Sequence, residues 1–354
     1  MGVGGAERIA IELLRDSCRR HDEVALLAAP GSLDREIESL PVRRSSLPDG
    51  RSPRAVAGGV AAAHRLARSF RPELIQAFNV RMTATVRASL RLAYLRRRPP
   101  LVAAYQGVPL GEVPAAARIL RAADLVVCPS EGITDQLEEH GFPPEKLTVV
   151  PNGVPRPMPL SSARRAELER ELALDADSEV VSLVARLAPQ KRHDRFLAAA
   201  AAVRRQRPQA RFLIVGEGPL RAELEAQTAR MGLDEVVQFT GSRTDAADII
   251  ARSDLMVLAS DWEGLSIAAL EAGARGVPVV STDVAGAREV LRTGAGVIVP
   301  KDAEALADAI VRTLADPHAR EAMRAEALRL HAERFSVARM TAGYRELYEQ
   351  LIRS

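Results

Sequence analysis

The chain has 354 residues, of which 47% are hydrophobic, 27% are charged and 3% are aromatic, and its formal net charge is +3 at pH 7. This apolar fraction is enough to bury the cores of about two domains, which excludes an extended disordered chain. No stretch approaches the about 20 consecutive apolar residues that a membrane-spanning helix needs.

Two adjacent glycines, Gly4 and Gly5, lie near the N-terminus, directly ahead of a helical pattern over residues 6–19. Because a helix N-terminus presents free N–H groups, this pair could admit a phosphate. A doubly wound domain opens with a strand ahead of its first glycine-rich turn, yet only three residues precede Gly4. We therefore expect the first N-terminal strand to be missing and the native start to lie upstream of Met1.

A strongly basic segment occupies much of the first half of the chain. Residues 43–121 contain 15 arginines and only three acidic residues, Asp49, Glu73 and Glu112, which gives a net charge of +12. Such a segment attracts phosphate groups or an anionic membrane surface. A solvated basic face is the alternative, because the whole chain has only three lysines and uses arginine as its ordinary cation. Nucleic acid is not expected as a partner, because aromatic side chains are not interleaved with the arginines.

The localisation expected from the sequence is cytoplasmic, with peripheral attachment to the cytoplasmic face of the membrane through the basic segment. The N-terminus has no apolar core and no cleavage site of the kind that directs secretion. Cys18 and Cys128 lie 110 positions apart and match no metal or redox spacing, so both are expected to be reduced thiols.

Short apolar runs in the first half predict strands that alternate with helices. They lie at residues 23–28, 74–77, 101–104, 125–128 and 147–150. Residues 151–159 then hold four prolines and one glycine, and a polar stretch follows to Ser178, so a linker is predicted here. The predicted domains are residues 1–155 and 156–335, and a helix at 336–354 is expected to pack back toward the N-terminal domain.

The second half shows the same alternation more clearly. Strands are predicted at residues 180–185, 212–215, 255–259, 277–281 and 297–299, and helices at 195–206, 220–231 and 267–274. Continuous apolar strands separated by helices are typical of a parallel sheet covered on both faces. The predicted fold class is therefore α/β, with two Rossmann-like doubly wound domains that face each other across a cleft and bind a ligand at the carboxyl ends of their strands.

The strongest motif runs from Ser260 to Val280, where a predicted strand is followed by a glycine-containing loop and a helix that begins near Ser266. The backbone of Gly264, Leu265 and Ser266 is suited to a diphosphate. Glu263 and Glu271 flank that position, and their carboxylates can accept hydrogen bonds from hydroxyls on both sides of it. A nucleotide sugar has this layout. The simpler interpretation is two acids near a helix start, stabilised by the helix dipole.

Two further strand-to-helix turns add candidate ligand-binding residues. Arg186 and Lys191 follow the strand at 180–185, and together they could neutralise a diphosphate. Gly216 and Arg243 lie in segments read as loops at the same edge, where glycines allow a close approach of a planar base. Ordinary turn chemistry is the alternative for this last pair.

Taken in order, these motifs resemble glycosyltransferase family 4, retaining transferases of the GT-B fold. The resemblance rests on residues 4–8, 123–130 and 150–154, on Arg186 with Lys191, and on residues 215–219 and 263–271. It implies that Arg186 and Lys191 bind the donor diphosphate and stabilise the departing nucleotide. Glu263 would contact hydroxyls of the transferred sugar. Glu271 would contact the ribose, Gly264–Ser266 the phosphates, and Gly4 with Gly5 would close from the other domain.

The resemblance also implies a reaction. A sugar would pass from a nucleotide-diphosphate sugar to a cell-envelope glycan or lipid-linked acceptor at the inner membrane face, with retention at the anomeric carbon and with no cofactor or metal. At two positions the chain departs from the family's usual residues, and both departures bear on this reaction. Tyr105-Gln106-Gly107 stands where the family usually has a His-Gly pair, so the acceptor-side Gln106 cannot become a cation. Ala285-Gly286-Ala287 replaces a usual Gly-Gly. The alternatives are an epimerase or phosphorylase of the same fold, or a non-catalytic subunit that binds a nucleotide sugar.

Overall fold

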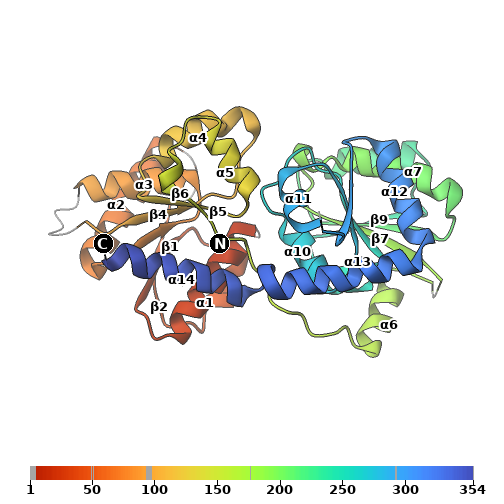
Figure 1. The fold of residues 1–354 in the computed structure, drawn as a ribbon, viewed down its shortest axis with the longest axis horizontal. Helices are drawn as coiled ribbons and strands as arrows, with labels where there is room; N and C mark the ends of the chain where they lie inside the picture. Colours follow the sequence, from red (N-terminus) through yellow and green to blue (C-terminus); the bar gives the residue numbers. More distant parts are fainter. Residues whose placement is uncertain are drawn as a thin grey trace. The chain divides into compact units, whose positions relative to one another are not determined.

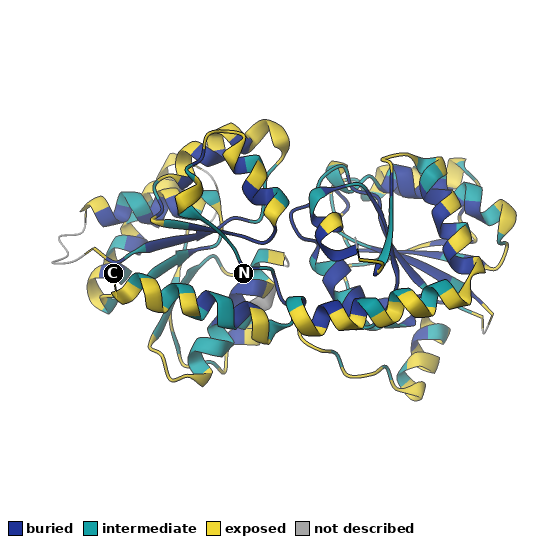
Figure 2. Cartoon of the chain, in the orientation of Figure 1, coloured by how far each residue is buried: buried dark blue, intermediate teal, exposed yellow. Residues whose placement is uncertain are grey.

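The computed structural model describes residues 5–48, 50, 52–92, 98–175, 177–291 and 293–353. The chain divides into two compact units (Figure 1). Unit 1 comprises Met1–Gly153 and Val337–Ser354, and unit 2 comprises Val154–Ser336. Each unit has parallel strands covered by helices, and the central strands are largely buried (Figure 2). The predicted α/β class with two Rossmann-like domains is confirmed.

The strands of unit 1 form two separate parallel sheets, β1-β2 and β3-β4-β5-β6. The core lies around β4 and β5, where Leu101, Val126 and Cys128 are fully buried. The described residues begin with α1 at Gly5, so the prediction of a missing first strand stays untested, and Gly4 lies outside them. The elements of unit 1 are α1 (Gly5–Arg19), β1 (Val24–Ala28), η1 (Ser32–Ile37), β2 (Val42–Ser46), α2 (Pro53–Phe70), β3 (Ile75–Ala77), α3 (Val80–Leu92), β4 (Leu101–Ala104), η2 (Leu110–Glu112), α4 (Val113–Leu120), β5 (Leu125–Cys128), α5 (Glu131–Glu138), η3 (Pro144–Lys146), β6 (Leu147–Val149) and α14 (Val337–Arg353).

Unit 2 is a single six-stranded parallel sheet in the order β12-β11-β10-β7-β8-β9. The first strand of the unit, β7, pairs with β8 on one side and with β10 on the other, so the winding reverses between β7 and β10. The elements of unit 2 are α6 (Ser162–Glu171), β7 (Glu179–Val184), η4 (Pro189–Lys191), α7 (His193–Gln206), β8 (Ala210–Val215), α8 (Arg221–Arg230), β9 (Val237–Gly241), α9 (Ala246–Arg252), β10 (Leu255–Leu258), α10 (Ile267–Ala274), β11 (Val279–Thr282), α11 (Ala285–Leu291), β12 (Gly296–Val299), α12 (Ala303–Ala315), α13 (Pro317–Leu330) and η5 (His331–Phe335).

The strands β2 and β9 and the helix α6 are among the elements that the sequence analysis did not predict. The strands β2 and β9 each lie at a sheet edge and carry polar residues, so neither forms the continuous apolar run that marks a buried strand. The interpretation of residues 239–241 as a loop was therefore wrong. The helix α6 lies inside the predicted linker and has one buried residue, Leu168, so it leaves almost no periodic pattern. Ser161 caps it, because its side chain accepts a hydrogen bond from the backbone N–H of Arg164.

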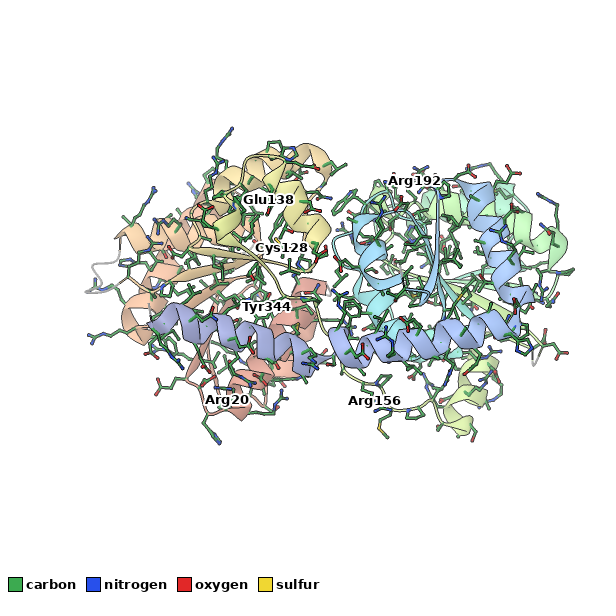
Figure 3. All side chains as sticks on the ribbon, in the orientation of Figure 1. Arg20, Cys128, Glu138, Arg156, Arg192 and Tyr344 are labelled. Carbon is green, nitrogen blue, oxygen red and sulfur yellow. The ribbon has the colours of Figure 1, made fainter. Side chains whose placement is uncertain are left out.

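The C-terminal helix α14 belongs to unit 1. Tyr344 is 1% exposed, and the backbone N–H of Gly153 lies 3.2 Å from the sulfur of Met340. Arg345 pairs with Asp16 of α1 at 3.1 Å. Figure 3 labels Tyr344 on this helix and Cys128 at the end of β5. The unit boundaries follow Gly153 and Ser336, within two residues of the predicted positions.

Candidate functional site

The candidate site lies in unit 2 at the point where the winding of the sheet reverses. In open parallel sheets, loops that follow two neighbouring strands on either side of such a point diverge and leave a crevice at the carboxyl ends of the strands. Here the two loops follow β7 and β10, and they are joined by a hydrogen bond from the backbone N–H of Asp261 to the carbonyl of Gln190 at 2.9 Å.

An ion pair between Lys191 and Glu263 occupies these two loops. The ammonium nitrogen of Lys191 lies 2.5 Å from Oε1 of Glu263, and the side chains are 18% and 7% exposed. The hydroxyl of Ser260 donates to the same carboxylate oxygen at 2.6 Å. Two predicted catalytic residues, 72 positions apart in the chain, are thus brought into contact.

A second charged cluster, which was not predicted from the sequence, lies beside this pair. Asp261 accepts from Arg192 at 3.1 Å and from Arg195 at 2.8 Å, and Arg195 also donates to the carbonyl of Ala259. Burial raises the pKa of Asp261, but hydrogen bonds from Arg195 and Arg192 outweigh it and hold that pKa below its ordinary value. The signal that could have revealed the cluster is the run of charged residues at 191–195 directly after a predicted strand.

Arg186 differs from its neighbours because it is exposed and makes no ion pair within the described part of the chain. Its guanidinium makes no hydrogen bond or ion pair with Lys191 or Glu263. A charged side chain at the same edge of the sheet without a counter-ion is available to a ligand.

The loop from Glu263 to Ser266 is buried and leads into α10. Ser266 caps that helix, because its hydroxyl accepts from the N–H of Ala269. A Cβ on Gly286 would lie 2.0 Å from the carbonyl oxygen of Gly264, so the glycine kept in Ala285-Gly286-Ala287 lets α11 approach this loop. Glu271 is half-buried in the second turn of α10, and its carbonyl accepts from Arg275 at 3.0 Å.

Gly216 lets the loop after β8 pack closely against the loop after β7. Its φ is +143°, and a Cβ there would lie 2.0 Å from the carbonyl oxygen of Ala185, so only glycine fits. The close neighbour is therefore the protein's own backbone at the end of β7. Binding of the donor by Gly216 stays a prediction.

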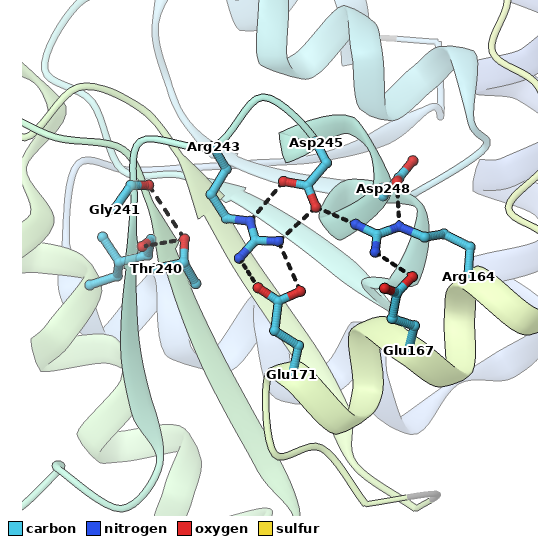
Figure 4. A network of polar contacts seen from close by, with 9 residues as sticks. Arg164, Glu167, Glu171, Thr240, Gly241, Arg243, Asp245 and Asp248 are labelled. Carbon is cyan, nitrogen blue, oxygen red and sulfur yellow. Dashed lines mark hydrogen bonds and ion pairs between the residues drawn. The ribbon is translucent and has the colours of Figure 1, made fainter.

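Arg243 lies in a polar network that joins α6 to the start of α9 (Figure 4). Its guanidinium is engaged by both carboxylate oxygens of Glu171 and by Asp245, and the side chain is 17% exposed. Arg164 pairs with Asp245, Asp248 and Glu167 in the same network. Since the donors of Arg243 are already bonded to carboxylates, the geometry favours a structural role over the predicted contact with a donor, which stays untested.

The predicted residues of unit 1 lie at the carboxyl ends of its own strands or at its first helix. Gln106 follows β4, and its side-chain oxygen accepts from the amide nitrogen of Asn152 at 2.7 Å. Asn152, which follows β6, is 1% exposed and was not singled out from the sequence. Gly5 is the exposed first residue of α1, and Gly4 falls outside the described residues.

Two general features of the described residues bear on ligands and location. None of the helices is long and apolar enough to span a bilayer. No group of three or more histidine, cysteine, aspartate or glutamate side chains in this part of the chain could hold a metal ion. Metal-independent transfer stays a prediction.

Comparison with protein families gives two matches that together cover most of the chain. Residues 3–156 match Glycosyltransferase Family 4, and residues 164–329 match Glycosyl transferases group 1. The two matched ranges fall within units 1 and 2 respectively, apart from three residues at the junction.

Individual relatives show the same relationship. An alpha-D-kanosaminyltransferase of Streptomyces kanamyceticus is 35% identical over 195 residues, which are 53% of this chain and 50% of that protein. A D-inositol 3-phosphate glycosyltransferase of Thermobispora bispora is 34% identical over 61% of this chain and 53% of that protein. The chain thus matches about half the length of these curated relatives.

A crystal structure of Anabaena Alr3699/HepE in complex with UDP and glucose shares the fold. Its TM-score is 0.83 at 24% identity, and the match covers 98% of this chain and 96% of that one.

Proposed function

We propose, from the premise that the chain belongs to glycosyltransferase family 4 and has the GT-B fold, that it transfers a sugar from a nucleotide-diphosphate sugar to an acceptor hydroxyl. The observation that carries the proposal is the Lys191–Glu263 ion pair at the switch point of the unit 2 sheet. The UDP and glucose bound by the HepE protein, which has the same fold, support a donor of this class.

The pair suggests how the site changes when a donor binds. Without a ligand, the Lys191 ammonium is neutralised by Glu263, which also accepts from Ser260. A diphosphate beside Lys191 would compete for the ammonium. The carboxylate of Glu263 would then be released to accept hydrogen bonds from hydroxyls of the sugar. Arg186, which is exposed and has no ion pair to any residue that the structure describes, would bind the other side of the diphosphate.

The chemistry follows from where charge develops. As the glycosidic bond breaks, negative charge grows on the departing diphosphate, so contacts from Lys191 and Arg186 strengthen in the transition state. The leaving phosphate oxygen takes the proton of the acceptor hydroxyl, and the new bond forms on the same face of the sugar, with retention. Since the two cations supply the neutralising charge, the transfer needs no metal.

The acceptor that the sequence favours is a cell-envelope glycan or a lipid-linked sugar at the cytoplasmic face of the membrane. The net charge of +12 over residues 43–121 would draw unit 1 to an anionic surface. Relatives named for lipopolysaccharide core biosynthesis support an envelope acceptor.

Release of free nucleotide from a panel of nucleotide sugars tests the proposal. We expect turnover with one donor and a loss of at least about 100-fold in kcat/KM in Lys191→Ala, because a charged donor to the leaving group is removed. Glu271→Ala should raise KM for the donor. Lys301→Ala, which removes an exposed lysine of the same unit, is the matched control and should retain activity.

The other readings have distinct outcomes. Interconversion of two nucleotide sugars without release of nucleotide would indicate an epimerase, and release that requires added inorganic phosphate would indicate a phosphorylase. Binding of a nucleotide sugar without turnover would identify a non-catalytic subunit. Equal activity in Lys191→Ala and Lys301→Ala would contradict the role given to the ion pair.

A further inference from the structure

A basic groove lies in unit 1 between the strand β2 and the helix α2. It is open, holds about 600 Å³, and is lined mainly by Arg43 and Arg44 of β2 and by His64, Arg65, Arg68 and Ser69 of α2. All four arginines are exposed.

Three of these four arginines have no carboxylate partner among the described residues, and the fourth, Arg44, has only a Coulombic interaction with Asp34. Arg43, Arg65 and Arg68 make no ion pair with any described residue, and Arg44 donates to the neutral backbone carbonyl of Ile37. In unit 2, by contrast, Arg192, Arg207 and Arg243 each pair with a carboxylate. Like charges held in one groove repel each other, and a bound anion removes that repulsion.

The groove lies at the opposite end of the strands from the residues predicted to serve transfer. Arg43 and Arg44 are in the first half of β2, and α2 runs back from the carboxyl end of β2 to the amino end of β3, so its last turns lie over the amino ends of the strands. His64 lies 3.4 Å from the carbonyl of Ser89, near the end of α3, which returns to the same side. Gln106 and Asn152 follow the carboxyl ends of β4 and β6.

The residues that line the groove favour a compact anion over a membrane surface. A membrane-binding face combines cations with exposed apolar side chains that insert into the lipid. The groove has one large apolar residue, Leu66, which is half-buried. Guanidinium groups from two elements around a concave space, with the hydroxyls of Ser45 and Ser69, suit a compact ligand with several phosphate oxygens.

We propose that this groove is a second anion site, separate from the donor site of unit 2, and that it binds a compact ligand carrying two or more phosphate groups. The site does not depend on sugar transfer, because none of its residues belongs to the proposed transfer machinery.

Calorimetric titration with inorganic pyrophosphate tests this site. Both arms carry Lys191→Ala, which weakens the proposed donor site in unit 2. The groove variant adds Arg65→Gln and Arg68→Gln. The control adds Arg205→Gln and Arg230→Gln, two exposed arginines of unit 2 that make no ion pair within the described chain. We expect the dissociation constant to rise by about tenfold or more in the groove variant and to stay unchanged in the control.

A second variant, Arg43→Gln, acts from the other wall of the groove and should weaken binding in the same direction. Equal binding in the groove variant and the control would overturn the proposal, as would no binding of pyrophosphate in the Lys191→Ala chain. Sedimentation with vesicles of phosphatidylglycerol and phosphatidylcholine is the third arm. Binding to vesicles that requires Arg65 and Arg68, without binding of pyrophosphate, would replace the compact ligand by a membrane surface.

Discussion

At the scale of single residues, Arg192 has a backbone conformation that is unusual for a side-chain-bearing residue. Its φ of 49° and ψ of 51° lie in the left-handed region, which glycine adopts at little cost. The guanidinium of Arg192 is held by Asp194 and Asp261, so the turn between η4 and α7 is stabilised by ion pairs instead of by a glycine.

Two substitutions at this position separate the effect of backbone strain from the effect of the side-chain ion pairs. Arg192→Gly and Arg192→Ala both remove the ion pairs, but only alanine keeps the strain of the left-handed conformation. We expect the glycine variant to be more stable than the alanine variant by about 1 kcal/mol in urea unfolding. Equal stability of the two variants would mean that the turn rearranges once the guanidinium is gone.

The buried side chain of His193, the next residue, should make the free energy of unfolding depend on pH. Burial lowers its pKa from 6.5 to about 4, with a further contribution from the positive charge of Lys191, and both ring nitrogens lack hydrogen-bond partners in the described structure. Because the folded state disfavours the protonated form, this stability is fully present above about pH 6.5 and is lost as the pH falls toward 4. The loss should reach about 3 kcal/mol.

Urea unfolding at pH 7 and pH 4.5 checks this effect. In His193→Leu the part of the pH dependence that comes from the imidazole is absent, so the difference in unfolding free energy between the two pH values should be smaller than in the wild type. The carboxylates titrate in both proteins and cancel in the comparison. The same pH difference in both proteins would exclude His193 as its source.

The sequence predicted Lys191 and Glu263 as functional residues but could not predict that they pair. Each follows a strand, which places it at the carboxyl edge of the sheet. Their contact at 2.5 Å depends on β7 lying beside β10, although six elements separate the two strands in the chain. The charges of Arg192, Arg195 and Asp261 were visible in the sequence, but their partnership was hidden for the same reason.

At the scale of elements, α6 is joined to unit 2 largely through charged side chains. Arg243 connects Glu171 of α6 with Asp245, and the hydrogen bond from Arg243 holds the pKa of Asp245 below its ordinary value. Within the helix only Leu168 is buried, and it packs with the C-cap residue Leu172 in a small apolar cluster, so the rest of α6 depends on its charged contacts.

We therefore expect Arg243→Gln to loosen α6. The variant should lose about 1–2 kcal/mol of unfolding free energy, and residues 155–178 should be cleaved faster in limited proteolysis. Affinity for a nucleotide sugar should be unchanged if the role is structural. Arg170→Gln, which removes an exposed arginine of α6 that makes no ion pair in the described chain, is the control. A selective loss of nucleotide-sugar affinity would restore the donor-binding role predicted from the sequence.

Elements differed in how well the sequence predicted them. The buried strands β4 and β5 were predicted with the observed bounds because both faces of a central strand are apolar. Edge strands such as β2 and β9 face solvent on one side, so their sequences alternate or are polar. Helices held by charge, such as α6, lack the apolar stripe on which a helical prediction rests.

At the scale of the whole molecule, the two units have separate sheets and separate apolar cores. The single tryptophan, Trp262, lies in unit 2, whereas Tyr344 is buried in unit 1 through α14. The rings of Tyr344 and Tyr348 are 5.9 Å apart. Fluorescence of Trp262 therefore reports on unit 2, and circular dichroism reports on both units.

Tyr344→Ala should lower the unfolding free energy of unit 1 by about 3–5 kcal/mol, because a large buried ring is removed. In urea, we expect an early transition by circular dichroism while the Trp262 transition keeps its midpoint. Ile352→Ala, at a position of the same helix that is 38% exposed, should leave both transitions nearly unchanged. Transitions that move together in Tyr344→Ala would show that the units unfold as one.

The sequence by itself determined the α/β class, the two domains, the family and the positions of Arg186, Lys191 and Glu263 after their strands. Those properties depend on local apolar patterns and on the order of motifs along the chain. Only the tertiary structure decided which charges meet. It paired Lys191 with Glu263, bound Arg243 to Glu171 and Asp245, and gathered Arg43, Arg65 and Arg68 in one groove without an ion pair to any described residue. These contacts follow from strand order and from helix placement, which bring together residues far apart in the chain and which local sequence does not encode.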